Sequence, residues 1–319
     1  MAKIMITYGV PMEGFGALSG HEVIAPPTGA VFTRAELLAL LPGTEAVLAC
    51  KGFDRELMEA APSLRIIVCY GAGYDTIDVH AATERGVMVA NTPDCVTAPT
   101  AELAIAHIMA QARRLVEFDT LSRTMPAAEL FRMGMRMGTS LEGATLGIVG
   151  MGRIGGRVAD FGRVMGMRVL YAARHAKPER DALGDRQVTL EQLMTDADFI
   201  SIHCPQTPET TGLISREMLA RMKPSAFLIN TARGPVVNEA ALLDALREKR
   251  IGGAGLDVYD GEPNVNPAFF ELKNVLLTPH VGSNTARARE QMALAASQRI
   301  LDALAGKAPQ NWLNPEARG

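Results

Sequence analysis

The chain has 319 residues, enough for about two domains. Its 32 basic and 35 acidic residues leave a net charge of −3, so we expect neither nucleic acid nor a membrane as a partner. No apolar run approaches the roughly 18 residues of a membrane span, and the N-terminus suits a strand rather than a signal peptide, which predicts a soluble cytoplasmic protein. The cysteines lack paired metal-ligand spacing, so we predict free, buried thiols and no metal site: Cys50, Cys69, Cys95 and Cys204.

In the first third of the chain, short β-prone runs alternate with helical patterns. The runs are 3–8, 46–50, 65–70 and 87–90, and the helical patterns are 34–41, 53–61 and 77–85. Such alternation predicts a parallel α/β sheet. Residues 71–75 follow one of these strands, at the edge where open α/β sheets bind ligands. Taken alone, their two glycines also fit a connecting loop that needs positive φ.

A helix is predicted at 100–115, where Ala, Leu and Ile fall on one face, and it would cross from one domain to the next. The pattern loosens over 117–143. There Phe131 and three methionines alternate with Arg and Gly. Methionine is usually a filler of cores, but this alternation suits an exposed arm that packs against another subunit.

The most specific local pattern begins at Thr145. An apolar run at 146–149 suits a buried strand, Gly150-Met-Gly-Arg-Ile-Gly155 has GxGxxG spacing, and 154–164 has helical periodicity. In dinucleotide sites the first glycine permits the turn, the second lets backbone approach the pyrophosphate, and the third allows close packing of helix on strand. Three glycines also occur in ordinary turns, but the flanking elements favour a dinucleotide site.

The next predicted strand, 167–172, ends where the choice of cofactor is decided. An NAD-preferring site has an acidic residue about 20 residues after the glycines, which binds the ribose 2′-hydroxyl. This chain has Ala172, Ala173, Arg174, His175 and Lys177 instead. An arginine can bind a 2′-phosphate with charge-assisted hydrogen bonds. We therefore predict that NADP(H) is preferred and NAD(H) possible, the alternative being that Arg174 is a solvated loop charge.

Further strands are predicted at 199–204, 226–230, 254–258 and 275–278, with helices at 190–197, 239–249 and 286–304. The strand ends carry Arg233, Asp257 followed by Glu262, and His280. Reduction of a small 2-oxo acid needs these three kinds of group. A guanidinium clamps the carboxylate and polarises the keto group, a histidine donates the proton, and a carboxylate holds the histidine's tautomer and favours its imidazolium form. Each residue alone could be a surface charge or a structural histidine.

With these motifs in order, the chain resembles the D-isomer-specific 2-hydroxyacid dehydrogenases, most of all the glyoxylate and hydroxypyruvate reductases. The resemblance covers nearly the whole length. Its carriers are Gly-Ala-Gly-Tyr-Asp-Thr-Ile-Asp at 71–78, Asn-Thr-Pro at 91–93, Thr-Ala-Glu at 100–102, Gly-Met-Gly-Arg-Ile-Gly at 150–155, His-Cys-Pro-Gln-Thr-Pro-Glu-Thr at 203–210, Asn-Thr-Ala-Arg-Gly at 230–234, Gly-Leu-Asp-Val-Tyr-Asp-Gly-Glu-Pro at 255–263 and Pro-His-Val-Gly-Ser at 279–283.

The resemblance implies a role for individual residues. Arg233 would clamp the substrate, His280 would donate the proton, and Glu262 would be the partner of His280. The amides of Ala72 and Gly73 would bind the substrate carboxylate, and Asp257 would lie near the nicotinamide carboxamide. The cofactor contacts that it implies are Gly150, Gly152, Arg153, Ile154, Gly155, Arg174, His175, Cys204, Pro205, Thr231, Ala232, Asp257 and Gly282.

The resemblance also implies a two-domain α/β fold. A Rossmann-type dinucleotide-binding domain, at about 98–285, would be inserted in a flavodoxin-like substrate domain formed by 1–97 and 286–319. A homodimer is implied, with contacts made by the helices around 100–145. The family often has a Trp in that arm, whereas the only Trp here is Trp312, and Phe131 or Met133 would take its place.

The predicted activity is NADPH-dependent reduction of glyoxylate or hydroxypyruvate to a D-2-hydroxy acid. The substrate pocket would be lined by loops around Lys51 and Tyr74. Glu262 disfavours formate dehydrogenases, which pair the histidine with Gln. Other 2-oxo acids, such as phenylpyruvate or 3-phosphohydroxypyruvate, remain alternatives. So does a nucleotide-sensing, corepressor-like binding protein, which the absence of long disordered tails disfavours.

Overall fold

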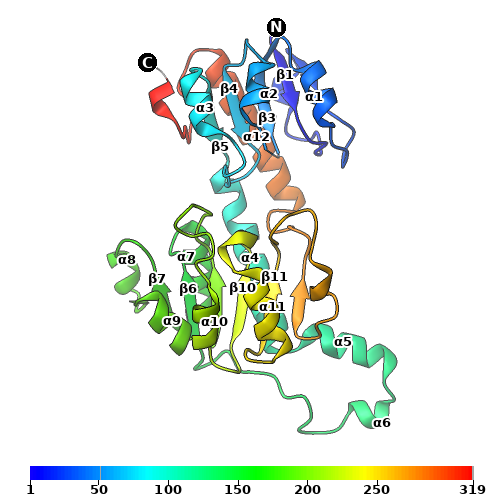
Figure 1. Cartoon of the computed structure of the whole chain (residues 1–319), viewed down its shortest axis with the longest axis vertical. Coiled ribbons are helices and arrows are strands. Elements are labelled where there is room, and N and C mark those ends of the chain that lie inside the picture. The colour runs from blue at the N-terminus through cyan, green and yellow to red at the C-terminus, as the bar shows by residue number, and fades with distance from the viewer. Residues whose placement is uncertain (51, 318–319) are drawn as a thin grey trace. The chain divides into compact units, whose positions relative to one another are not determined.

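The computed structural model describes residues 1–50 and 52–317, so Lys51 lies outside the described residues. The chain divides into two compact units (Figure 1). The first unit consists of Met1–Val96 and Ser283–Gly319, and the second consists of Thr97–Gly282. Within the described residues, no helix is both long enough and apolar enough to cross a membrane.

The first unit is built on a parallel sheet whose strand order is β2-β1-β3-β4-β5, the flavodoxin-like order. Ile6, Leu48 and Val68 of this sheet pack against Ala296 and Ile300 of the last long helix, α12. The strands are β1 (Lys3–Ile6), β2 (Glu22–Ile24), β3 (Thr44–Ala49), β4 (Ile66–Cys69) and β5 (Met88–Asn91), and the helices are α1 (Arg34–Leu40), α2 (Arg55–Glu59), α3 (Val79–Glu84) and α12 (Ala286–Leu304).

The second unit has a parallel sheet of order β12-β11-β10-β9-β6-β7-β8. Counted from β6, this is the Rossmann order with one further strand, so the predicted α/β fold class is confirmed. The strands are β6 (Thr145–Val149), β7 (Arg168–Ala172), β8 (Arg186–Gln187), β9 (Phe199–Ile202), β10 (Phe227–Asn230), β11 (Gly253–Leu256) and β12 (Val275–Leu277). The helices are α4 (Pro93–Ala112), which starts in the first unit, α5 (Leu115–Thr124), α6 (Ala127–Leu130), α7 (Arg153–Val164), α8 (Pro178–Asp181), α9 (Leu190–Asp196), α10 (Arg216–Arg221) and α11 (Glu239–Arg247).

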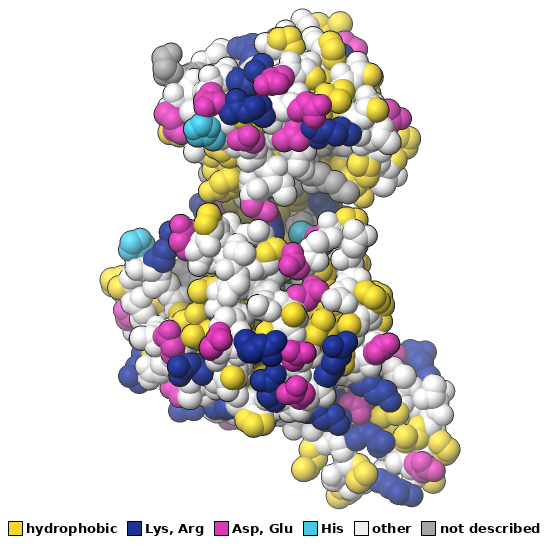
Figure 2. Space-filling view, viewed as in Figure 1, with side chains coloured by type: hydrophobic (Ala, Val, Ile, Leu, Met, Phe, Trp, Pro, Cys, Tyr) yellow, Lys and Arg dark blue, Asp and Glu magenta, His cyan; other side chains and the backbone are white. Residues whose placement is uncertain are grey.

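Residues 113–138, which include α5 and α6, form an arm that extends from the second unit (Figure 1). Its base is closed by a hydrogen bond from the Thr139 N–H to the Ala112 carbonyl, 2.8 Å long. Phe131, Met133 and Met137 are 85%, 101% and 77% exposed. Figure 2 shows such hydrophobic side chains on the arm beside Lys and Arg side chains. The predicted exposure of this segment is therefore correct.

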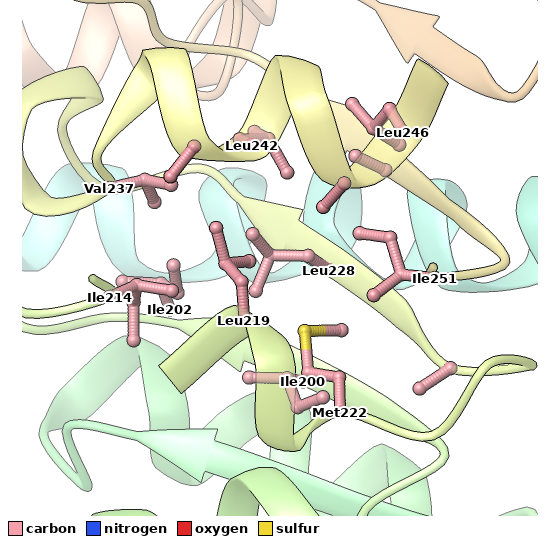
Figure 3. Close-up of a cluster of buried hydrophobic side chains, with 14 of the residues drawn as sticks. Ile200, Ile202, Ile214, Leu219, Met222, Leu228, Val237, Leu242, Leu246 and Ile251 are labelled. Carbon is pink, nitrogen blue, oxygen red and sulfur yellow. The ribbon is translucent and has the colours of Figure 1, made fainter. Parts of the chain in front are cut away.

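A large core cluster of the second unit lies between strands β9 and β10 and helices α10 and α11 (Figure 3). Ile200 and Leu228 on the strands and Leu242 on α11 are at most 2% exposed. Parallel strands covered on both faces read as nearly continuous apolar runs, which is why they were visible in the sequence. The helices start at caps: the Ser215 and Asn238 side chains accept from backbone N–H groups three residues later.

Some boundaries differ from the sequence prediction. Helix α4 begins at Pro93 rather than at residue 100, because a proline is well tolerated in the first helical turn, and the helix then continues through Pro99. It ends at Ala112, and Arg114 with φ of 53° separates it from α5. The edge strands β2 and β8 were missed because they are short and only partly buried. All four cysteines are free, but only Cys69 is fully buried; the other three are partly exposed.

Two neighbouring glycines of α7 give a test of the strand-turn-helix packing. A Cβ on Gly155 would lie 2.3 Å from the Gly150 carbonyl oxygen, whereas a Cβ on Gly156 would approach nothing nearer than Arg180 Nη1 at 3.9 Å. Gly155→Ala should therefore lower stability by about 2 kcal/mol, as overpacking does. Gly156→Ala should raise it by roughly 0.5 kcal/mol, because alanine is the better helix former. Thermal denaturation of both variants measures the difference, and equal shifts in Tm would contradict this packing.

Candidate active site

The predicted cofactor and catalytic residues of the second unit follow the carboxyl ends of its strands. Because the strands are parallel, these ends lie at one edge of the sheet. Taken across the sheet from β7 to β12, the residues that follow the strands are Arg174, Gly150, Cys204, Thr231, Asp257 and His280. With strands about 4.8 Å apart, this edge runs for roughly 24 Å. It therefore separates a basic end at Arg174 from an end that holds the candidate catalytic groups.

Gly150 lies at the switch point between β6 and β9, where the strand order reverses. Its φ is +97°, and a Cβ at this position would lie 2.6 Å from the backbone nitrogen of Cys204. Both the dihedral angle and the close approach therefore require glycine here. The Gly150 N–H donates to the Ala172 carbonyl at 2.9 Å, so the turn is also tied to β7.

Gly152 is the N-cap of α7 and makes no side-chain capping hydrogen bond. A Cβ on Gly152 would meet no described atom within 4 Å, so the space beside this N-cap residue is open. The first turn of α7 consists of Arg153, Ile154 and Gly155. Free N–H groups at such a helix N-terminus can donate hydrogen bonds to an anion. The hydroxyl of Thr231 is buried and has no hydrogen-bond partner among the described residues. These features fit the pyrophosphate of a dinucleotide.

Arg174 and His175 follow β7 and are exposed. The turn that carries them is fixed from both sides. The Gln187 side chain donates to the Ala173 carbonyl at 3.0 Å, and the Lys177 N–H donates to the Tyr171 hydroxyl at 3.1 Å. The structure thus places a guanidinium, and no acidic residue, directly after this strand.

His280 and Glu262 form a hydrogen-bonded pair, with 2.6 Å between His280 Nδ1 and Glu262 Oε2. The other oxygen, Oε1, accepts from the Tyr259 N–H at 2.9 Å. Burial acts to raise the pKa of the Glu262 carboxyl. The opposing effects of His280, the Tyr259 N–H and the charge of Arg233 are together larger, so this pKa lies below its usual value. Glu262 is therefore an ionised acceptor at neutral pH, to which the His280 Nδ1–H donates.

Arg233 reaches the same site through the loop that follows β10. The Asn230 side chain shapes this loop: it accepts from the Ala232 N–H at 3.0 Å and donates to the Arg233 carbonyl at 2.9 Å. Next to it, a Cβ on Gly234 would lie 2.0 Å from the Tyr259 carbonyl carbon, so the two loops pack backbone to backbone. The Arg233 charge lowers the pKa of Glu262, which places the guanidinium within electrostatic reach of the His280–Glu262 pair.

Asp257 is 1% exposed and holds the segment that carries His280. Its Oδ1 accepts from the Val281 N–H at 2.8 Å, and its Oδ2 accepts from the Gly282 N–H at 2.9 Å. The Thr278 hydroxyl donates to Oδ1 at 2.6 Å. Sequence reasoning missed Thr278 and Tyr259, although both lie within two or three residues of a predicted site residue.

Ala72 and Gly73 belong to the first unit, where they follow β4. Their loop is tied to the end of β5, because the Asn91 side chain donates to the Ala72 carbonyl at 2.7 Å and the Thr92 N–H donates to the Gly71 carbonyl at 2.8 Å. Their role in binding a substrate carboxylate stays a prediction.

Known proteins resemble the chain in sequence and in structure. The sequence model of the family described as D-isomer specific 2-hydroxyacid dehydrogenase, NAD binding domain, matches residues 105–282. A glyoxylate reductase of Thermococcus litoralis is 41% identical, over 98% of this chain and 97% of the relative. The TT0316 protein of Thermus thermophilus has a TM-score of 0.89 at 40% identity, over 98% of this chain and 99% of that one. An NADPH-dependent glyoxylate/hydroxypyruvate reductase of Sinorhizobium meliloti, solved with NADP and malonate, has a TM-score of 0.87 at 28% identity, over 99% and 97%.

Proposed function

The chain belongs to the D-isomer-specific 2-hydroxyacid dehydrogenase family, and we propose that it reduces glyoxylate or hydroxypyruvate with NADPH. Membership confirms the prediction of an oxidoreductase that uses a nicotinamide dinucleotide and acts on 2-oxo acids. The names of the relatives from Thermococcus and Sinorhizobium support the choice of substrate. A cytoplasmic location remains part of the proposal.

The His280–Glu262 pair is the observation that carries the proposed mechanism. Because Nδ1 is held by Glu262 at 2.6 Å, Nε2 is the ring nitrogen that can donate a proton to substrate. A nicotinamide dinucleotide, which the glycine turn and the N-terminus of α7 would hold, would supply a hydride to the carbonyl carbon. Proton transfer from His280 Nε2 to the carbonyl oxygen completes the alcohol, and the ionised Glu262 stabilises the imidazolium before transfer. In the reverse direction, the neutral His280 accepts the proton of the hydroxyl group.

The Arg233 guanidinium is proposed to bind the carboxylate and keto oxygens of the substrate. A guanidinium is always charged and presents two parallel N–H donors, which match a carboxylate. Its positive charge also lowers the pKa of Glu262, and so favours the ionised carboxylate that accepts from His280. The Asn230 hydrogen bonds that shape the loop hold the Arg233 backbone in place before substrate binds.

His280→Ala should lower kcat by about 10² or more, because it removes the proton donor. His80→Ala is the matched control, since His80 is an exposed histidine on α3 with a side chain 81% accessible. The measurement is steady-state oxidation of NADPH with glyoxylate and with hydroxypyruvate, alongside NADPH affinity by fluorescence. Equal kcat values for His280→Ala and His80→Ala would show that His280 is not the proton donor.

Arg174→Ala should raise the KM for NADPH about tenfold, because a charge-assisted hydrogen bond to the 2′-phosphate contributes roughly 1.5 kcal/mol or more. The KM for NADH should change less than about twofold, since NADH has no 2′-phosphate. Arg186→Ala provides the control, because this exposed arginine lies on the neighbouring strand β8, where it pairs with Leu170 in the middle of β7 rather than following the end of that strand. Equal changes for both cofactors would mean that Arg174 does not select NADPH.

A homodimer is proposed from the exposed arm of residues 113–138. Side chains as apolar as Phe131 and Met133 rarely stay fully exposed together on a monomer, and a second copy of the chain offers the same surface. Met133→Glu should therefore shift the protein from about twice the chain mass to the chain mass of 34.2 kDa in sedimentation velocity. Leu183→Glu, at a position 53% exposed outside the arm, should leave the mass unchanged. A wild-type protein that sediments as a monomer would contradict the proposal.

A further inference from the structure

His107 is a buried histidine with no assigned role. It lies on α4 and is 1% exposed, between Ala104 and Ile108, which are both fully buried. Its ring rests on the bare backbone of β11, because a Cβ on Gly255 would lie 2.7 Å from His107 Nδ1. Burial lowers the pKa of this imidazole, so the ring is neutral at ordinary pH.

The Nε2 atom of His107 lies 3.1 Å from the Thr278 hydroxyl oxygen. That hydroxyl has one proton, which it donates to Asp257 Oδ1 at 2.6 Å. The bond from His107 is therefore an Nε2–H donating to a lone pair of Thr278. This bond leaves the Thr278 proton directed at the carboxylate.

Asp257 in turn holds the segment that carries His280 by hydrogen bonds. It accepts from the Val281 and Gly282 N–H groups, and its carbonyl accepts from the His280 N–H at 2.8 Å. His280 has φ of +52°, a left-handed conformation that costs a non-glycine residue about 1 kcal/mol or more. Such a conformation persists only where its surroundings hold it in place.

We propose that His107 is a positioning residue: through Thr278 and Asp257 it holds the backbone that presents His280 for proton transfer. The proposal rests on the proposed role of His280 and concerns how this side chain is kept in place. The proposed role requires no contact of His107 with substrate or cofactor.

The test compares His107→Leu, which removes the donor, with His107→Gln, whose side-chain amide can donate again to Thr278. In the full-length protein, His107→Leu should lower kcat about tenfold with KM changed less than twofold, since a misplaced catalytic group slows the chemical step. His107→Gln should restore most of that loss. Gln111→Leu is the control. Gln111 lies one turn further along α4 and donates to the Ala254 carbonyl of β11, so it takes no part in the His107–Thr278–Asp257 hydrogen bonds. Its replacement should leave kcat unchanged.

A double-mutant cycle separates positioning from packing. Thr278→Val should lower kcat as much as His107→Leu does. The double variant should have a kcat no lower than either single variant, because both substitutions break the same His107–Thr278–Asp257 hydrogen bonds. Wild-type kcat in His107→Leu, additive losses in the cycle, or equal loss in the Leu and Gln variants with the same fall in Tm would each overturn the proposal. An inactive wild-type protein would instead contradict the proposed function itself.

Discussion

The parallel direction of the strands in the second unit is the constraint on which the site depends. When every strand points the same way, the loops that follow them must emerge at one edge, however far apart they are in sequence. Gly150, Arg233 and His280 are thus brought to one edge by topology alone. The strand order reverses between β6 and β9, and the glycine turn and the N-terminus of α7 follow β6 at this switch point.

Within that edge, electrostatics and backbone geometry support each other. The Glu262 side chain is 32% exposed, and its partial burial alone would favour the neutral form, yet its neighbours lower its pKa and keep it ionised. Its two oxygens connect His280 to the Tyr259 backbone, and the Tyr259 hydroxyl reaches the carbonyls of Leu256 and Thr278. His280, Glu262 and the ends of β11 and β12 are therefore connected by one set of hydrogen bonds. A shift of any one of them would therefore move the His280 imidazole.

Close approaches of neighbouring backbone or side-chain atoms explain the glycines of the site better than flexibility does. Gly150 against Cys204, Gly234 against Tyr259 and Gly255 against His107 all leave too little room for a Cβ. Gly152 is different, because its Cβ would meet no described atom. The glycines that packing requires can thus be distinguished from Gly152, where packing against the described residues does not require a glycine.

Much of this protein could be predicted from sequence, because the signals are local. Buried parallel strands are apolar runs, the glycine turn has a fixed spacing, and Arg233, Glu262 and His280 directly follow or lie near such runs. The ordered motifs also pointed to the family. Edge strands β2 and β8 escaped prediction because short half-exposed strands have little pattern. The start of α4 escaped it because a proline inside a helix, as at Pro99, is unfavourable by itself and persists here in a packed helix. Only the tertiary structure decided that His107 on α4 contacts Thr278 at 3.1 Å and, through it, Asp257. A histidine on an apolar helix face has no local signature of its partner, since a contact between residues so distant along the chain exists only once helix and sheet have packed.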